Sequence, residues 1–283
     1  MIVIRLQGGL GNQLFQYAFG RRLALIRGEE LFLDDEGFKN DRVTFRKYSL
    51  GVFNVKAEII SSKYLYKIKY PLGLFSKISA LIETKFLRHF NIGYNALLLK
   101  SKKKYFSGFF QSYKYFEPIR ETLLEEITLQ EPLDDKYADL LKRMRDSDSV
   151  SLHVRRGDYV NDAKTKKAHY TFGLEYYQAA IKIIADKISN PVYFVFSDDI
   201  AWAKENLKIN AETFFVSAPN IKDYEELILM SKCQNNIIAN SSFSFWGAWL
   251  NRNTAKLVIA PKKWNNIYTL EYEKLLPHNW LKI

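Results

Sequence analysis

The second half of this chain alternates short runs of β-branched and aromatic residues with longer segments in which apolar residues recur at helical spacing. The strand-like runs cover residues 150–154, 191–197, 212–217, 235–240 and 255–260, and the helical patterns lie near 174–187, 199–207, 221–233 and 243–251. Parallel strands need long crossovers, which are usually helices. This half is therefore predicted to form a parallel sheet with helices on both faces.

The first half shows the same alternation less regularly. It has predicted strands at 2–6, 31–33 and 105–112, and helical patterns at 13–28, 115–127 and 136–146. The chain has 283 residues and a hydrophobic content of 47%, which is enough for two cores. Because the alternation of strands and helices becomes regular near residues 146–149, we expect two Rossmann-like α/β domains that face each other, at 1–148 and 149–283.

The formal net charge of +11 is concentrated in one segment. Residues 55–104 hold eleven Lys or Arg against Glu58 and Glu83, a local balance of +9. This basic helical insertion interleaves Lys with Tyr, Leu, Ile and Phe, which suits a surface that touches anionic lipid, although a solvated helical face explains the pattern equally well. A nucleic-acid-binding protein would also be basic, but the segment shows no RNP or helix-turn-helix pattern, so we expect no nucleic-acid partner.

Hydropathy and cysteine content point to a globular chain in the cytoplasm. No run of about 18 apolar residues exists, and the N-terminal "MIVIRLQGG" is too short for a signal peptide. The single cysteine, Cys233, cannot form an internal disulfide, and its apolar helical surroundings predict a buried, structural thiol.

Polar clusters follow three of the predicted strands in the second half. They are "HVRRGD" (153–158), "SDD" (197–199) and "NSSFSFW" (240–246). The carboxyl ends of parallel strands share one edge of a sheet, where helix N-termini also gather, so the three clusters are expected to converge on one ligand site.

The residue types in these clusters favour a diphosphate. Period-two alternation puts His153 and Arg155 on one side of their strand, with Arg156 pointing elsewhere. Arginine suits bidentate phosphate contacts, and the serine-rich "NSSFSFW" adds hydroxyls. Asp198 could accept hydrogen bonds from sugar hydroxyls or guanine, or simply cap the following helix. The charged run "SLHVRRGDYV" could likewise be an ion-paired turn that closes a strand.

The turn "GGLGNQ" after the first strand is a partial dinucleotide fingerprint. It contains Gly9 and Gly11, but Leu14 occupies the third small position of G-x-G-x-x-G. The glycines let a ligand approach the backbone, and Asn12 places an amide there; a tight turn without a ligand is the alternative. A nicotinamide-dependent oxidoreductase would also need an acid near this point, and Asp34 or Asp35 could serve.

The sequence favours a reaction without a metal. Asp146-Ser147-Asp148 matches D-x-D, but it precedes its strand and is predicted to be a turn and cap. The four histidines show no zinc-ligand spacing, and arginines can neutralise a diphosphate. We therefore predict metal independence.

Four motifs, in this order and spacing, resemble the bacterial α-1,2-fucosyltransferases of glycosyltransferase family eleven. They are "GGLGNQLFQYAFGRRLA", "HVRRGDYV", "FSDDIAW" and "NSSFSFWGAWL", and the resemblance runs from residue 2 to about 264. It implies a GT-B architecture, with the acceptor side in the N-terminal domain and GDP-fucose in the C-terminal domain. It further implies inverting, metal-independent transfer to the 2-hydroxyl of a terminal galactose, in the synthesis of O-antigen, capsule or another surface glycan.

The resemblance also assigns roles to residues. It implies that Arg155 and Arg156 contact the GDP diphosphate, that His153 and Asp198 lie near the guanosine, and that Asn12 faces the reaction centre. The remaining donor-binding positions that it implies are Gly9, Gly11, Ser241, Ser242, Phe243 and Ser244.

Charge development during the reaction identifies two kinds of catalytic group. GDP gains negative charge as it departs, so a preorganised arginine, Arg155, is expected to stabilise the transition state. Inversion also needs a base for the attacking hydroxyl. Asp158 is one candidate, although it could instead hold Arg155 in place. The rival bases are Asp162, His169 and Glu175.

Overall fold

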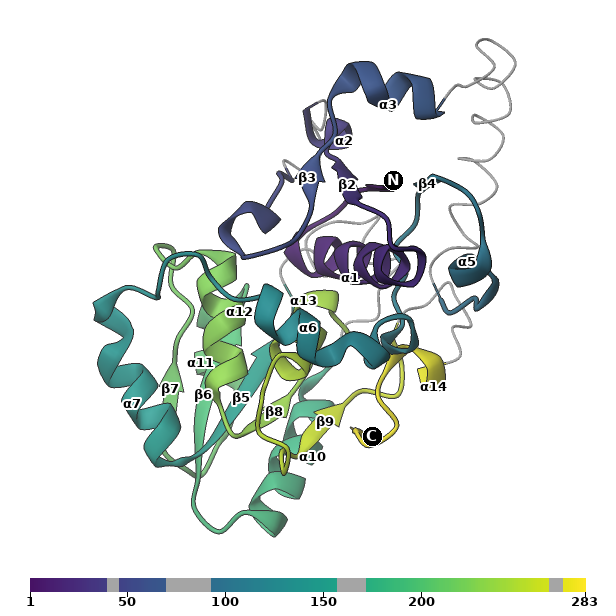
Figure 1. Ribbon diagram of the computed structural model, residues 1–283. Helices are drawn as coiled ribbons and strands as arrows, with labels where there is room; N and C mark the ends of the chain where they lie inside the picture. Colours follow the sequence, from purple (N-terminus) through teal and green to yellow (C-terminus); the bar gives the residue numbers. More distant parts are fainter. Residues whose placement is uncertain (40–45, 70–92, 157–171, 265–271) are drawn as a thin grey trace. The chain divides into compact units, whose positions relative to one another are not determined.

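The computed structural model describes residues 1–39, 46–69, 93–156, 172–264 and 272–283 (Figure 1). The chain divides into two compact units. One comprises Met1–Glu131 with Glu273–Pro277, and the other comprises Pro132–Tyr272 with His278–Ile283.

The second unit is built on a six-stranded parallel sheet in the order β10-β9-β8-β5-β6-β7. Its strands are β5 (Asp148–Val154), β6 (Pro191–Ser197), β7 (Thr213–Phe215), β8 (Asn235–Ile237), β9 (Val258–Ala260) and β10 (Leu281–Lys282). β5 and β6 pair along their whole length, with Val154 opposite Ser197. The parallel sheet expected for this half is confirmed.

The helices of the second unit cover both faces of this sheet (Figure 1). They are α7 (Ala138–Asp146), α10 (Leu174–Lys187), α11 (Ile200–Asn206), α12 (Asp223–Lys232) and α13 (Ser242–Trp249). Val150, Leu152 and Val154 of β5 pack against buried residues of α10 and α11. The alternate residues face α12 and α13: Asn236 donates from its amide to Ser151 Oγ and to a carbonyl of α12. The period-two alternation of β5 is therefore confirmed.

The first unit has a four-stranded parallel sheet in the order β3-β2-β1-β4. Its strands are β1 (Ile2–Arg5), β2 (Leu31–Asp34), β3 (Glu58–Ile59) and β4 (Tyr105–Phe106). The long helix α1 (Leu10–Arg27) lies directly against β1, since a Cβ at Gly20 would come within 2.5 Å of Ile4 Cγ1. α1 ends as its sequence predicts, at Gly28 in the left-handed conformation (φ 63°).

Shorter helices complete the first unit. They are α2 (Glu36–Lys39), α3 (Ser62–Lys69), α5 (Leu97–Lys100), α6 (Arg120–Glu126), and single 3₁₀ turns at Leu50–Val52, Tyr113–Tyr115 and Glu117–Ile119. Another 3₁₀ turn, Asp135–Tyr137, precedes α7 in the second unit, and α14 (Tyr272–Leu275) lies where the chain passes between the units. Of the basic insertion at 55–104, residues 70–92 lie outside the described residues.

Two expectations for the first half are wrong in detail. The predicted strand at 105–112 is limited to the two residues of β4, because its aromatic side chains pack instead of extending a ladder: Phe110 adopts a positive φ (51°) and stacks on Phe19 at 4.0 Å. The predicted helix at 115–127 is interrupted before α6 by two 3₁₀ turns.

The division of the chain at Glu131 and Pro132 comes before the expected boundary at residue 148. α7 accounts for the difference, since it belongs with the second unit. Ser149 of β5, which is fully buried, donates from its hydroxyl to the carbonyl of Met144 in α7. The change in sequence pattern near 146–149 marks the start of a central strand and not the end of a domain.

Candidate donor site at the carboxyl edge of the second sheet

The three polar clusters predicted to converge lie at the carboxyl ends of neighbouring strands. β5 lies between β6 and β8 in the sheet. β7 is added on the far side of β6, whereas β9 and β10 are added on the far side of β8. The connections after β5, β6 and β8 therefore meet at the point where the strand order reverses, which is where open α/β sheets bind their ligands.

Asp198 joins the end of β6 to the end of β5. Its Oδ2 lies 3.0 Å from Arg155 Nη1, and its Oδ1 accepts a hydrogen bond of 2.8 Å from the main-chain N–H of Arg156. Both Arg155 and Asp198 are 22% exposed, so this ion pair is partly shielded from water. The alternative that Asp198 caps the next helix is wrong, because Asp199 accepts the capping bond from the Trp202 N–H at 3.2 Å.

Arg156 turns away from Arg155, as the strand alternation predicts. Its guanidinium carbon lies 3.8 Å from the centre of the Trp202 ring, and its Nε lies 3.8 Å from Asp199 Oδ2. The N-cap residue and the first turn of α11 therefore provide a carboxylate and an aromatic face for this cation.

His153 forms the buried floor beside the arginines. It is 3% exposed, and its ring centre lies 5.7 Å from that of Phe243. Burial lowers the pKa of His153 to about 4; the charge of Asp198 opposes this shift and that of Arg155 adds to it. His153 is therefore a neutral imidazole near pH 7, and its Nδ1 has no hydrogen-bond partner in the described part of the chain.

The serine-rich cluster forms the N-terminus of α13. Ser241 is the N-cap residue and makes no side-chain capping bond, while Ser242 and Phe243 are half-buried. Ser244 differs from them, because its buried hydroxyl accepts the main-chain N–H of Ala239 at 3.0 Å and so braces the turn after β8. Ser241 and Ser242 thus place hydroxyls next to the positive end of a helix dipole, which suits an anion.

Two residues near this edge have no role in the sequence-based prediction. One is Trp202, which lies within the quoted motif "FSDDIAW" but carries no titratable group. The other is Glu226 of α12. Burial raises the pKa of Glu226 to about 7; a hydrogen bond from Ser217 opposes the shift, and the nearby charges of Asp223 and Asp198 increase it. Its helix reads as an amphipathic core helix, so only the tertiary structure brings this carboxylate near Asp198.

The glycine-rich turn of the first unit is braced by amide side chains. Gln13 donates from Nε2 to the carbonyls of Gly8 (3.0 Å) and Lys47 (2.8 Å), and its Oε1 accepts the N–H of Ser49 (2.9 Å). Gln16 donates to the Gly108 carbonyl at 3.0 Å. These bonds hold the start of α1, and they explain the glutamines of this motif without a ligand.

Asn12 occupies the first turn of α1, beside residues that the sequence does not single out. Gln111 donates to Asn12 Oδ1 at 2.8 Å. Gly9 is the N-cap residue, and a Cβ there would lie 3.5 Å from Arg46 Nη1. Gly11 is buried within the same turn. The first unit therefore places an arginine and two amides around the N-terminus of its longest helix.

Asp34, one of the two acids that could serve a nicotinamide site, is committed elsewhere. Asp34 is 1% exposed, and its carboxylate pairs with Lys69 at 2.7 Å and accepts the Tyr105 hydroxyl at 2.7 Å and the Glu36 N–H at 3.1 Å. This carboxylate holds β2, β4 and α3 together, so it is not available for a ribose.

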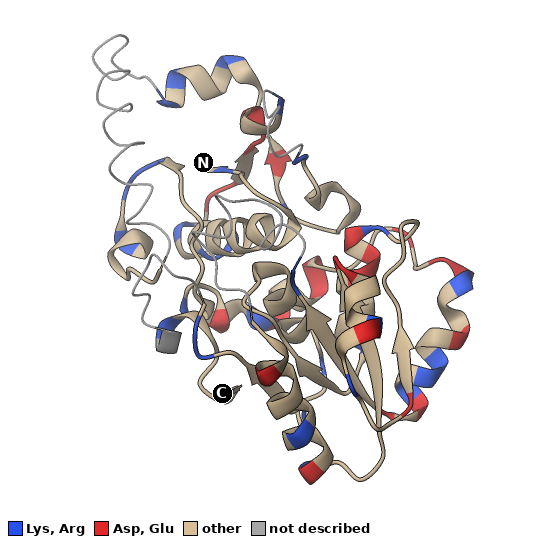
Figure 2. Ribbon diagram, turned by 180° about the vertical axis from the view of Figure 1, so that it is seen from behind, with Lys and Arg blue, Asp and Glu red and all other residues tan. Residues whose placement is uncertain are grey.

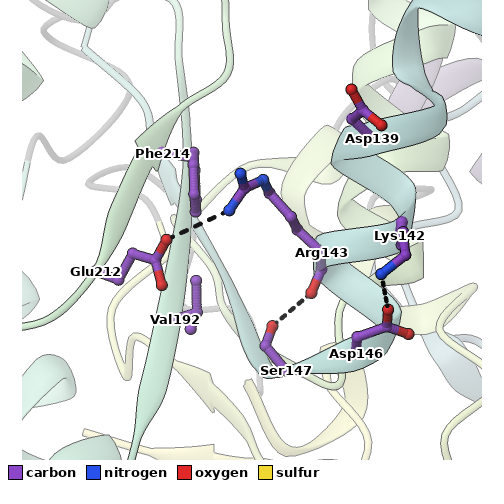
Figure 3. Close-up of a pocket in the computed structure, with 8 residues that line it drawn as sticks. All are labelled: Asp139, Lys142, Arg143, Asp146, Ser147, Val192, Glu212 and Phe214. Carbon is purple, nitrogen blue, oxygen red and sulfur yellow. Dashed lines mark hydrogen bonds and ion pairs between the residues drawn. The ribbon is translucent and has the colours of Figure 1, made fainter.

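The D-x-D sequence lies at the opposite edge of the second sheet from the arginines. Asp146 ends α7 and pairs with Lys142 at 2.8 Å and Arg145 at 3.1 Å, and hydrogen bonds from these cations lower its pKa. It borders a hollow of about 500 Å³ that Arg143, Glu212 and Phe214 also line (Figure 3). In the described ranges, no three His, Cys, Asp or Glu residues are grouped so as to hold a metal.

Of the four candidate bases, the structure describes Glu175. Asp158, Asp162 and His169 lie outside the described residues. Glu175 is exposed in the first turn of α10, and a Cβ at the N-cap residue Gly173 would come within 2.1 Å of Glu175 Oε2. A carboxylate folded over a helix N-terminus stabilises that helix, which accounts for Glu175 without a catalytic role.

Comparison with known families identifies the chain. The model of the family "Glycosyl transferase family 11" matches residues 1–283. The chain belongs to this family. The resemblance inferred from the four motifs is thereby confirmed, and the oxidoreductase and nucleic-acid-binding alternatives are wrong.

Two relatives from Escherichia coli match this family 11 chain over nearly its full length. The "O-antigen biosynthesis glycosyltransferase WbnK" is 34% identical over 98% of this chain and 99% of the relative. The "Alpha-1,2-colitosyltransferase" is also 34% identical, over 100% and 99%. "Galactoside alpha-(1,2)-fucosyltransferase 2" of Rattus norvegicus is 23% identical over 88% of this chain and 67% of its own length.

Solved structures confirm the fold class. The fucosyltransferase NodZ from Bradyrhizobium has a TM-score of 0.53 at 14% identity, over 87% of this chain and 90% of that structure. The two parallel α/β sheets expected of a GT-B glycosyltransferase are confirmed by this likeness and by the strand order in each unit.

Proposed function

We propose that this family 11 enzyme transfers L-fucose from GDP-fucose to the 2-hydroxyl of a terminal galactose, with inversion and without a metal. The observation that carries the proposal is the Arg155–Asp198 ion pair at the carboxyl edge of the second sheet. Arg155 follows β5, and β5 is the neighbour of β8. The connection after β8 leads to the serine-rich N-terminus of α13. An oriented guanidinium, serine hydroxyls and a helix dipole together suit a diphosphate.

Each part of the donor has a matching group in the proposed site. Arg155, Ser241 and Ser242 bind the diphosphate, and Arg156 adds positive charge beside it. Phe243 and the neutral His153 line the nucleoside side, with Ser244 supporting the turn. Gly9, Gly11 and Asn12 are assigned to the sugar side of the donor on the family resemblance.

Carboxylates near the site favour guanine as the nucleobase of the donor. Guanine presents adjacent N1–H and N2–H donors, which one carboxylate can accept together, whereas adenine has an acceptor at N1. Asp198 was the predicted partner, but its oxygens already bind Arg155 and Arg156. Glu226 is the better candidate, because its half-buried carboxylate, with a raised pKa, gains most from two donors that a ligand brings.

The reaction is a single displacement. The galactose O2 attacks C1 of fucose while the bond from C1 to the β-phosphate oxygen breaks, and the hydroxyl proton passes to a base. Arg155 stabilises the charge that develops on the departing GDP. Asp158 is the proposed base, with Asp162, His169 and Glu175 as its rivals.

The names of the relatives leave two donor sugars to compare. One relative is a colitosyltransferase and others are fucosyltransferases, and colitose is 3-deoxy-L-fucose. The NodZ structure that was co-crystallised with GDP shares the fold, with a TM-score of 0.52. These relatives support a GDP-bound 6-deoxy sugar as the donor and an O-antigen or another surface glycan as the product.

The test is a transfer assay with GDP-fucose and GDP-colitose, a panel of β-galactosides, and EDTA in parallel reactions. We expect an α-1,2-linked fucoside by NMR, with the rate unchanged by EDTA. Thermal shifts with GDP, ADP and NAD give a separate readout, and GDP should stabilise the chain most. Activity lost in EDTA, a β-fucoside, or stabilisation by NAD but not by GDP would contradict the proposal.

We also propose that α3 contacts an anionic membrane surface, where a lipid-linked acceptor would be presented. Figure 2 shows basic positions along this helix. Lys63 and Lys67 are exposed, as are Tyr64 (63% exposed) and Tyr66 (51%), while Leu65 is buried (1%). Tyrosine and lysine on one outer face suit a lipid headgroup region. In the described residues, no helix has the length and apolar character needed to cross a bilayer.

Liposome co-sedimentation tests this contact. Binding to vesicles with anionic lipid should fall when Lys63 and Lys67 are both changed to Glu, while the transfer rate to a soluble galactoside stays unchanged. Lys102, Lys103 and Lys104, at the end of the basic insertion at 55–104, provide a second charge-reversal variant. Failure of the native chain to bind anionic liposomes would remove this part of the proposal.

A further inference from the structure

We propose that Trp202 is a positioning residue for the donor site: with Asp199 it clamps the Arg156 side chain, and so fixes the segment that carries Arg155. This inference rests on the proposed function, because it specifies how the diphosphate-binding arginines are held. Neither the family match nor the names of the relatives assign a role to Trp202.

The clamp is built from one turn of α11. The Asp199 N–H donates to Ser197 Oγ at 2.9 Å, and Asp199 Oδ1 accepts the Trp202 N–H at 3.2 Å. These bonds fix the turn, while Asp199 Oδ2 faces Arg156 Nε at 3.8 Å. One aspartate thus caps the helix and pairs with the arginine, and the capped turn presents the indole.

The indole completes the enclosure of Arg156. Its ring centre lies 3.8 Å from the guanidinium carbon, which is contact distance for a cation stacked on an aromatic face, and the Arg156 side chain is only 19% exposed. Arginine has considerable rotamer freedom, so a stacked and paired guanidinium restrains the backbone to which it is attached.

That backbone leads directly into the phosphate-binding arginine. β5 ends at Val154, and neither Arg155 nor Arg156 belongs to a strand. Asp198 holds this dipeptide from one side through the Arg155 side chain and the Arg156 N–H. Trp202 and Asp199 hold it through the Arg156 side chain. The dipeptide is therefore fixed before the donor arrives, which lowers the entropy cost of binding.

A packing role for Trp202 makes a different prediction. The half-buried indole also packs against the core beside α10 and α11. If packing were its only role, leucine would replace it as well as phenylalanine does, and thermal stability would change without a selective effect on GDP. If the aromatic face holds Arg156, phenylalanine should preserve function and leucine should not.

The experiment measures GDP affinity by calorimetry, and kcat and KM for GDP-fucose, in the wild type, W202F and W202L. We expect W202L to weaken GDP binding by about tenfold and to lower kcat, and W202F to retain most of both. The matched control is F214L. It removes another aromatic face under an arginine, Arg143 at 5.1 Å, at the opposite edge of the same sheet (Figure 3), and it should leave GDP affinity unchanged.

A double-mutant cycle links the effect to Arg156. W202L combined with R156K should bind GDP no more weakly than the poorer single variant, because both changes break one clamp. Should W202L fail to fold, D199N takes its place, because asparagine keeps the capping oxygen and loses the charge that faces Arg156. It should weaken GDP binding in the same direction.

The outcomes separate this inference from the proposed function. A wild-type chain that binds neither GDP nor GDP-fucose removes the proposed function and the clamp with it. If the wild type binds GDP normally, three results would overturn the clamp alone. They are wild-type GDP affinity in W202L, equal losses in W202F and W202L, and fully additive losses in the double variant.

Discussion

Asp198 places a carboxylate oxygen 3.0 Å from Arg155 Nη1, and its second oxygen holds the main-chain N–H of the next residue. One side chain at the end of β6 thus fixes both the direction of the Arg155 guanidinium and the backbone that follows it. An arginine held in this way meets a diphosphate without first having to be ordered.

The first prediction concerns this ion pair. In Asp198→Asn, an oxygen remains to accept the Arg156 N–H, but the charge opposite Arg155 is lost. We expect kcat/KM for GDP-fucose to fall roughly 100-fold, which corresponds to ~2–3 kcal/mol for a charged hydrogen bond in a partly buried site. Steady-state kinetics measures the change.

Asp186→Asn is the control for the Asp198 variant. Asp186 pairs with Lys182 at 2.8 Å on the exposed face of α10, and both side chains are more than half exposed. An exposed pair of this kind contributes ~0.5 kcal/mol or less, so this variant should keep wild-type kinetics. Equal kinetics in the two variants would show that Asp198 does not orient a catalytic arginine.

The second prediction concerns Asp158, which was expected to be either the base or the residue that orients Arg155. Asp198 pairs with Arg155 and so can orient it, which supports the proposal that Asp158 acts in proton transfer. Asp158→Asn should keep GDP affinity and lower kcat by about 100-fold or more, the usual contribution of a general base. Calorimetry and single-turnover kinetics give the two readouts. Loss of GDP affinity would return Asp158 to an orienting role.

The sequence was sufficient to predict the alternation of strands and helices, the parallel sheets and the meeting of three polar clusters at one edge. These depend on local periodicity and on a rule about strand ends. It was not sufficient to show which aspartate binds which group. Asp198 and Asp199 are adjacent and chemically identical, and only the direction of each carboxylate separates the arginine partner from the helix cap.

Tertiary packing determines the environment of two residues that sequence periodicity could not predict. Phe110 lies in a run of aromatic residues typical of a strand, but it stacks on Phe19 of α1 instead of continuing β4. Glu226 follows the pattern of a core helix, and its raised pKa exists only because folding buries it near Asp198. Such effects need contacts between residues distant in sequence.

The third prediction uses the raised pKa of Glu226, about 7 against an ordinary value of 4.5. Between these two values the folded chain binds more protons at this site than the unfolded chain does. Stability from this group is therefore fully present below pH 4.5, and it is lost as pH rises through 7. Glu226→Gln should match the wild type near pH 4.5 and be more stable by ~1–2 kcal/mol at pH 8, once solvent screening is allowed for.

Denaturant unfolding at the two pH values measures this difference. Glu205→Gln on α11 is the control, since Glu205 is exposed and should give the same change at both pH values. A Glu226→Gln variant whose stability advantage does not grow between pH 4.5 and 8 would contradict the assignment of a buried, proton-binding carboxylate.

The fourth prediction compares two glycines of the first unit that share a left-handed backbone. Gly8 has φ 78°, and a Cβ there would come within 2.5 Å of Asn12 Nδ2; Gly28 has φ 63°, and a Cβ there would meet nothing within 4 Å. Both alanine variants lose roughly 1 kcal/mol of stability from backbone strain. Only Gly8→Ala also displaces Asn12, so it should lower kcat for fucosyl transfer at least tenfold, while Gly28→Ala keeps the wild-type rate at a temperature where both are folded.

Thermal unfolding and transfer assays on the same samples separate the two effects. Equal rates in the two variants would show that the position of Asn12 does not matter for catalysis, and would leave the glycine-rich turn as a structural turn braced by Gln13.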